Sequence, residues 1–141
     1  MPEQQYVRDP LRRKDVPLTP EERVRQWFIS VLHKEAGVPV HMMMSEVGLK
    51  YGEGPVKKEF RADIVVFDRR PSPVMVVECK RPDVVLDRNV LEQALRYDMV
   101  LDVRYIVITN GGSTFVCRKN LDGRAEFIGK LPAYEEMLLC R

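Results

Sequence analysis

Hydrophobic residues in this chain of 141 residues recur at two different spacings, and the spacing predicts where helices and strands lie. A helical spacing begins near residue 19. Thr19 suits the N-cap and Pro20 suits the first helical position, and Glu22 at the third position completes a capping-box pattern. Gly37 marks the end of this helix. Its predicted apolar face consists of Val24, Trp27, Phe28, Val31 and Leu32.

Shorter apolar runs, rich in valine and isoleucine, predict strands, and Asn110-Gly111-Gly112 predicts a tight turn. The order helix, three strands, helix, two or three strands is typical of an α/β (α+β) fold with helices packed on a mixed sheet. The predicted strands lie within residues 40–49 and over residues 61–68, 74–80, 104–109, 113–118 and 125–129, with further helices over 87–101 and within 133–141.

The length predicts one domain, which we expect over residues 19–141. Residues 1–18 are expected to form an irregular arm, because three prolines interrupt any regular element there. The cluster Arg12-Arg13-Lys14 in this arm is interpreted as a solvated tail, with contact to nucleic acid as the alternative.

Composition narrows the class of protein. A net charge of +2, from 23 basic and 21 acidic residues, argues against a strongly basic polyanion binder but allows a local positive patch. Cys79, Cys117 and Cys140 show no C-x-x-C spacing, so we expect buried thiols in a reducing compartment. No signal peptide or membrane-spanning stretch is visible, and a cytoplasmic protein is expected.

Two neighbouring strands carry the most informative polar residues, Asp63, Glu78 and Lys80. If these strands form a hairpin centred between residues 70 and 71, the numbers of paired residues sum to 141. Asp63 then faces Glu78, Arg61 faces Lys80, and all four side chains share one face of the sheet. Two carboxylates so close repel each other unless a cation lies between them, which predicts a metal site. The alternative is a surface acid and a solvated strand end.

The two predicted helices add candidate ligands. Gln93 and Tyr97 are four residues apart and share one face of the second helix, where they suit contacts to phosphate, although a helix-edge amide and a packing ring fit the same pattern. Glu21 lies near the rim of the apolar face of the first helix, whereas Glu22 points away from that face. Glu21 is thus a candidate metal ligand, or simply an acid favoured at the start of a helix.

With these residues in place, the chain resembles the PD-(D/E)XK nuclease superfamily, and most closely the N-terminal nuclease domain of type I restriction enzyme R (HsdR) subunits. The matching stretches are TPEERVRQWF, RADIVVFD, VVECKRP, EQALRYD and VITNGG, in the family's order. Ala62 replaces the proline that gives the superfamily its name, a change the superfamily tolerates. The chain has no phosphate-binding loop and no room for a motor, which puts the restriction role in doubt more than the nuclease core.

The resemblance implies hydrolysis of DNA phosphodiester bonds with Mg²⁺, for which Mn²⁺ can substitute. It implies DNA as a partner, with a restriction, modification or helicase subunit and a homodimer as further possibilities, and no membrane. The alternative function is a non-catalytic module that binds DNA or docks onto a motor or modification subunit. The implied catalytic residues are Asp63, Glu78, Lys80, Gln93 and Tyr97; the implied metal ligands are Asp63, Glu78, the Cys79 backbone carbonyl and Glu21 or Glu22; and the candidate nucleic-acid contacts are Lys57, Lys58, Arg61, Arg81, Gln93 and Tyr97.

Overall fold

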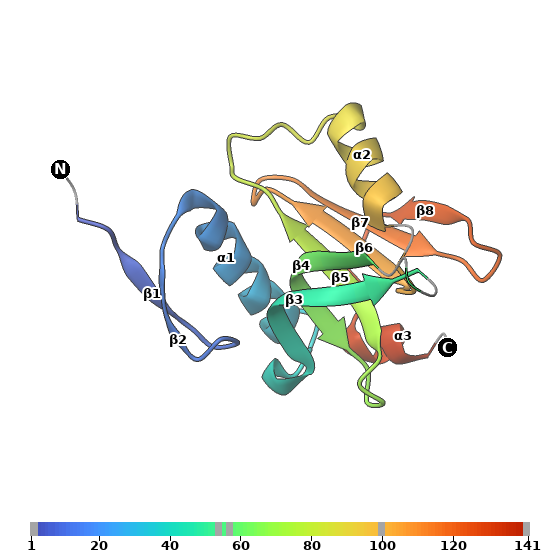
Figure 1. The fold of residues 1–141 in the computed structure, drawn as a ribbon, viewed down its shortest axis with the longest axis horizontal. Helices are drawn as coiled ribbons and strands as arrows, with labels where there is room; N and C mark the ends of the chain where they lie inside the picture. The colour runs from blue at the N-terminus through green and yellow to red at the C-terminus, as the bar shows by residue number, and fades with distance from the viewer. Residues whose placement is uncertain (1–2, 53–54, 56–57, 99–100, 140–141) are drawn as a thin grey trace.

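The computed structural model describes residues 3–52, 55, 58–98 and 101–139, without the side chains of Lys58, Tyr97 and Asp98. The elements follow the predicted order, preceded by two short strands (Figure 1). They are β1 (Tyr6–Asp9), β2 (Lys14–Pro17), α1 (Pro20–Lys34), η1 (Val40–Met42), β3 (Met43–Tyr51), β4 (Lys58–Phe67), β5 (Pro73–Cys79), α2 (Arg88–Asp98), β6 (Tyr105–Thr109), β7 (Thr114–Lys119), β8 (Ala125–Ile128) and α3 (Tyr134–Leu138).

One six-stranded sheet, in the order β3-β4-β5-β6-β7-β8, forms the centre of the molecule. The pair β5–β6 is parallel and every other neighbouring pair is antiparallel, so the sheet is mixed, as predicted. A parallel pair needs a crossover between its strands, and α2 lies in the segment that provides it. Because β5 and β6 are central, every one of the residues 74–77 and 105–108 is buried.

Helices cover both faces of the sheet. Phe28 and Leu32 of α1 pack with Ile64 and Val77 of the sheet and with Tyr134 of α3, so α1 and α3 share one face. On the opposite face Ala94 of α2 packs near Ile108 of β6. The predicted first helix is confirmed at its start, where the Thr19 hydroxyl accepts a hydrogen bond of 3.1 Å from the Glu22 backbone N–H.

Trp27 departs from the predicted apolar face of α1. Val24, Phe28 and Leu32 are buried, whereas Trp27 is 43% exposed. Its ring lies at the edge of the stripe, where it lines a groove together with Phe115 of β7 and Phe127 of β8.

The N-terminal segment differs from the irregular arm expected for residues 1–18. Strands β1 and β2 pair in an antiparallel hairpin, in which Tyr6 lies opposite Pro17 and Asp9 opposite Lys14. Asp9 is fully buried and bonds to the Arg12 guanidinium, which also contacts Glu22 of α1 at 2.6 Å. Arg12 is therefore a structural residue and not a solvated one, because its charge is matched by two carboxylates.

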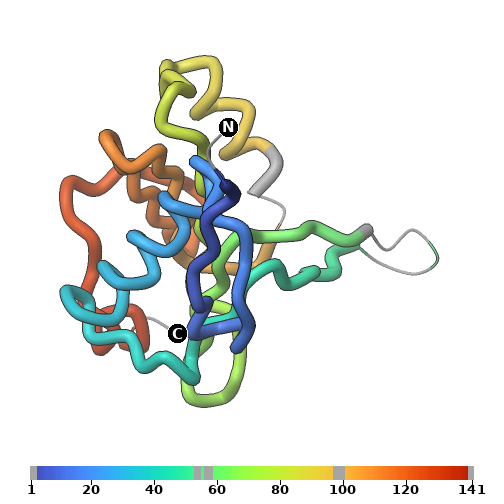
Figure 2. The backbone as a smooth tube through the Cα atoms, turned by 90° about the vertical axis from the view of Figure 1, so that its left-hand side faces the viewer, coloured from blue at the N-terminus to red at the C-terminus, as the bar shows by residue number. Residues whose placement is uncertain are grey.

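The distal halves of β3 and β4 project from the body of the molecule (Figure 2).

The predicted turn after β6 is confirmed, because the Asn110 side chain accepts hydrogen bonds from the backbone N–H groups of Gly112 and Ser113. Cys79 and Cys117 are buried free thiols, as predicted, and Cys140 lies outside the described residues. In the described part of the chain, no helix has the length and apolar character needed to cross a membrane.

Candidate active site

The register of the β4–β5 hairpin is the one predicted from the sequence. Residues 64, 65 and 66 pair with residues 77, 76 and 75, and each pair sums to 141. A bulge follows at Phe67, which pairs with Pro73. The paired region ends one residue short of Asp63 and Glu78, so the position of these two side chains depends on other contacts.

Asp63 is fixed to the end of β5 by its side chain. Its Oδ2 atom accepts a hydrogen bond of 2.7 Å from the backbone N–H of Cys79, the residue between Glu78 and Lys80. A charged acceptor makes such a bond stronger than one between neutral groups. The Asp63 carboxylate is thus held directly against the peptide that lies between Glu78 and Lys80.

The regular alternation of side chains along β4 is interrupted around Asp63. Ala62 and Ile64 are two residues apart, yet Ala62 packs in the cluster on the α2 face and Ile64 in the cluster on the α1 face. The neighbouring strand is also irregular here: Glu46 lies between the pairs Ser45–Ile64 and Val47–Ala62 and has φ +54°. A left-handed backbone is unusual for a residue other than glycine and interrupts the regular alternation of side chains.

Asp63 lies in a mixed electrostatic environment. Its Oδ1 atom is 3.6 Å from the Arg25 guanidinium of α1. Burial, the largest influence, raises the pKa of Asp63; the Cys79 N–H and Arg25 lower it, Glu21 raises it further, and Lys80 lowers it slightly. The net pKa lies above the ordinary value, because burial outweighs the groups that lower it.

Glu78 and Lys80 line a hollow of about 310 Å³ beneath α2, together with Gln93 and Phe60. The Lys80 ammonium is 3.8 Å from the Glu78 carboxylate, and the Lys80 backbone N–H donates to Thr109 of β6 at 2.8 Å. Gln93 is exposed on α2 at the mouth of this hollow. Tyr97 belongs to the same helix, but its side chain lies outside what the structure describes.

The two acids at the start of α1 have different surroundings. Glu22, which was predicted to point away from the apolar face, is buried beneath the N-terminal hairpin, where it contacts Arg12 at 2.6 Å and Gln26 at 3.1 Å. Glu21 is partly exposed, and no described residue forms a hydrogen bond or ion pair with its carboxylate. Its charge acts on Asp63. Glu21 is therefore better placed than Glu22 to serve the site.

The donor atoms suit a hard cation. Mg²⁺ prefers oxygen ligands and retains several waters, so two carboxylates and a backbone carbonyl match its chemistry. Asp63, Glu78 and the carbonyl of Cys79 would offer such a set of oxygen ligands. Among the described residues, no three His, Cys, Asp or Glu side chains are grouped closely enough to hold a metal by themselves.

Comparison with known proteins places the chain in a family. The family model described as type I restriction enzyme R protein N terminus (HSDR_N) matches residues 20–132. The chain belongs to this family. The fold of this HSDR_N chain resembles that of a fragment of a putative HsdR subunit of a type I restriction enzyme from Vibrio vulnificus YJ016, with a TM-score of 0.56 and 20% sequence identity.

That likeness covers 83% of the HSDR_N chain and 24% of the Vibrio chain, so the chain spans about a quarter of the length of the protein it matches. At this level of identity the similarity concerns the fold. A search among curated proteins found no match.

The basic residues expected to contact nucleic acid are only partly described in this HSDR_N chain. Arg61 is exposed on β4, opposite Gly48 of β3. Arg81 is exposed and forms an ion pair of 2.6 Å with Asp83. Lys57 lies outside the described residues, and Lys58 is described only in its backbone, which pairs with Tyr51.

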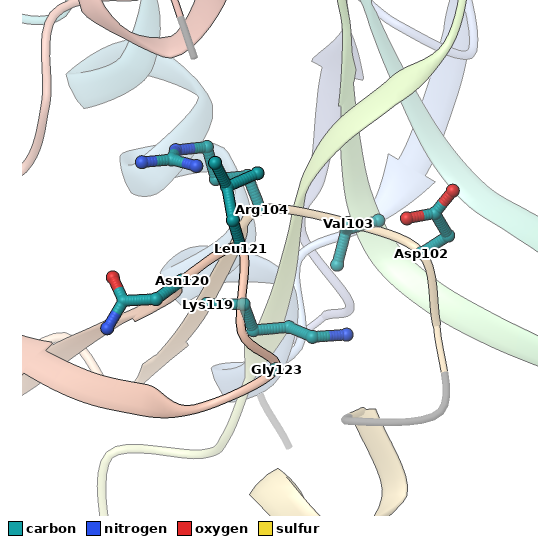
Figure 3. A pocket seen from close by; sticks show the side chains of 7 residues that line it. All are labelled: Asp102, Val103, Arg104, Lys119, Asn120, Leu121 and Gly123. Atoms are coloured by element: carbon teal, nitrogen blue, oxygen red, sulfur yellow. The ribbon is translucent and has the colours of Figure 1, made fainter. Parts of the chain in front are cut away.

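A second polar hollow, of about 330 Å³, lies at the other end of β6 (Figure 3). Asp102 and Arg104 line it from the segment before β6, and Lys119 and Asn120 from the end of β7. The Lys119 ammonium donates to the backbone carbonyl of Leu101 at 2.5 Å. None of the residues predicted for the HSDR_N site lines this hollow.

Sequence reasoning did not identify Arg25, Ser45 or Glu46 as site residues. The side chain of Arg25 is only 6% exposed, and its guanidinium donates to the Ser45 hydroxyl at 3.0 Å. A signal was present, because Arg25 lies one turn after Glu21 and Glu22 and adjoins the apolar stripe at Val24. A basic residue in that position predicts a buried ion pair.

Proposed function

We propose that this chain is a metal-dependent DNA endonuclease module of the type I restriction R-subunit N-terminal type. One observation carries the proposal: Asp63 is bonded through its carboxylate to the peptide between Glu78 and Lys80. This contact joins Asp63 to the segment that carries Glu78 and Lys80, and the resemblance implies that all three residues are catalytic. It leaves the second oxygen of Asp63 directed toward charged groups and not toward apolar packing.

Each residue has a proposed role that follows from its surroundings. Asp63, Glu78 and the Cys79 carbonyl would hold Mg²⁺, and Glu21 would act through a bound water. When bound, the ion supplies charge neutralisation of the scissile phosphate and acidification of a water. Lys80, beside Glu78, would orient the attacking water and offset the negative charge that develops on the phosphate. Gln93, and Tyr97 one turn later, would position the DNA backbone across the hollow.

Cleavage assays test this function. Purified protein is expected to cut DNA with Mg²⁺ or Mn²⁺, and Asp63→Asn and Lys80→Ala are each expected to reduce the rate by at least about 10²-fold. Asp15→Asn, which removes an exposed carboxylate from the N-terminal hairpin, is the matched control for Asp63→Asn. Folded protein that cuts neither supercoiled, linear nor single-stranded DNA with either metal would contradict the proposal. Matched RNA oligomers test the choice of nucleic acid.

A second candidate is a non-catalytic module that binds DNA or docks onto a motor or modification subunit of a restriction system. The observation that favours it is the Arg25 guanidinium beside Asp63, which already supplies a positive charge to the carboxylate. Calorimetry separates the two functions. Mn²⁺ binding that is lost in Asp63→Asn supports the nuclease, whereas Mn²⁺ binding that is absent or unchanged in that variant supports the second function.

A further inference from the structure

Arg25 is the buried cation nearest to Asp63 in the described residues. It extends from α1 toward the sheet, and its side chain is only 6% exposed. One end of its guanidinium is firmly held, because Nη1 donates to the Ser45 hydroxyl at 3.0 Å and lies 3.2 Å from a Glu46 oxygen. The Ser45 hydroxyl in turn donates to the backbone carbonyl of Asp63 at 3.0 Å. Arg25 is therefore part of the structure that surrounds Asp63 and not a surface residue near it.

The other end of the guanidinium is incompletely satisfied. Nη2 is 3.6 Å from Asp63 Oδ1, too far for a hydrogen bond. Nε is 3.5 Å from Glu22, is buried and has no hydrogen-bond partner among the described residues. A buried donor without a partner is costly, and such an arrangement is uncommon unless another state satisfies it. One guanidinium is thus shared among Glu22, Glu46 and Asp63, and its contact with Asp63 is the longest.

We propose that Arg25 is a built-in counter-ion for Asp63, which a divalent metal displaces when it binds. The inference rests on the proposed function, since it assigns a positioning residue to the same site. Asp63 stays in place without Arg25, because its Oδ2 atom is held by the Cys79 N–H. Arg25 need not leave the interior, because Glu22, Glu46 and Ser45 retain it. Its positive charge therefore opposes the metal, and the affinity of the site is set below what the carboxylates alone would give.

Mn²⁺ titration followed by electron paramagnetic resonance tests the inference, because free Mn²⁺ gives a signal that bound Mn²⁺ loses. Arg25→Gln is expected to bind Mn²⁺ at least about threefold more tightly than wild type, since a positive charge near the ion is removed. Arg23→Gln is the matched control: it lies on the same helix, removes the same charge and is exposed, with Gln5 as its partner. Its Mn²⁺ affinity is expected to equal that of wild type. Unchanged or weaker binding by Arg25→Gln would overturn the inference.

A metal-free measurement keeps the inference separate from the proposed function. In urea unfolding with a chelator, the destabilisation caused by Arg25→Gln is expected to be smaller when Asp63 is already Asn, because the partner charge is gone. Additive effects would overturn the counter-ion role, even if the nuclease function holds. A wild-type protein that binds no Mn²⁺ would overturn the proposed function and the displacement step, whatever the unfolding data show. Should Arg25→Gln not fold, Arg25→Lys replaces it, with a smaller change in the same direction expected.

Discussion

The fold buries the carboxylate of Asp63, and this burial lowers the stability of the folded state. Asp63 is held by one backbone N–H and lies near one arginine, yet burial raises its pKa above the ordinary value. An ionised carboxylate in such a position disfavours the folded state unless a cation joins it. Natural proteins retain destabilising groups of this kind chiefly where function needs them.

The stability cost of Asp63 predicts a pH dependence. The folded state binds the Asp63 proton more tightly than the unfolded chain, so stability is full below the ordinary pKa of 3.8 and falls as pH rises through the raised pKa. Asp63→Asn removes this loss and keeps an oxygen for the Cys79 N–H. In urea unfolding with a chelator, the variant is expected to gain stability relative to wild type from about pH 4 upward and then to level off.

Asp15→Asn is the control for this measurement, because it removes an exposed carboxylate of the same kind. A difference between Asp63→Asn and wild type that stays constant from pH 4 to pH 8 would show that Asp63 titrates alike in the folded and unfolded chain. With added Mn²⁺, wild type is expected to become more stable than Asp63→Asn, because Mn²⁺ binds the wild-type site and stabilises the folded state by mass action.

At the residue scale, the sequence predicted the register of two strands but not the contacts that the side chain of Asp63 makes. The β4–β5 register, in which the numbers of paired residues sum to 141, was predicted correctly. The two-residue periodicity of the strands and the Pro-rich turn between them leave few other ways to pair the two strands. The bond between Asp63 and the Cys79 N–H was not predictable, since it joins a side chain to the backbone of the neighbouring strand beyond the last paired residues, Ile64 and Val77. Arg25 was missed for a related reason: its partners lie on three separate elements.

At the scale of elements, the N-terminal hairpin is the main difference from the sequence prediction. Proline was taken to exclude regular structure, but Pro17 lies at the end of a short strand, where its missing N–H costs little. Charged contacts join the hairpin to α1. Asp9 accepts from the backbone N–H of Leu11 and from Arg12, and Arg12 continues to Glu22 of α1.

The surroundings of Asp9 predict which change would loosen the N-terminal hairpin from the rest of the molecule. Burial alone would raise the pKa of Asp9, but hydrogen bonds from Arg12, Leu11 and Gln26 outweigh it, and the pKa is lowered. The stabilisation is therefore present above pH 3.8 and is lost as pH falls through the lowered pKa. Asp9→Asn is expected to weaken the hairpin by about 1–3 kcal/mol at neutral pH, because Arg12 loses a buried charged partner.

Limited proteolysis with trypsin measures this release, since Arg13 is exposed between β1 and β2. Cleavage there is expected to accelerate in Asp9→Asn and to stay at the wild-type rate in Asp15→Asn, which changes an exposed carboxylate in the same hairpin. Equal cleavage rates in Asp9→Asn and wild type would show that other contacts hold the hairpin.

At the scale of the whole molecule, the two long helices are anchored very differently. Phe28 and Leu32 of α1 are almost completely buried in the largest apolar cluster, whereas Ala94 is the most buried described residue of α2, at 9% exposed. The sequence predicted both helices and their order, because each has a recognisable apolar spacing. It did not predict this difference, because the apolar spacing of a helix does not show how much of the helix its neighbours will cover.

The unequal anchoring predicts two levels of stability, which native-state hydrogen exchange can resolve. Backbone amides of α2 are expected to exchange through local opening, while those of β5 and β6 exchange only on global unfolding. Leu32→Ala, at a fully buried position of α1, is expected to lower global stability by about 2–5 kcal/mol. The free energy of exchange in β5 and β6 should fall by the same amount. The free energy of exchange in α2 should stay unchanged as long as local opening of α2 costs less than global unfolding. An equal loss of protection in α2 and the central strands would instead make the helix that carries Gln93 and Tyr97 part of one cooperative unit with the sheet.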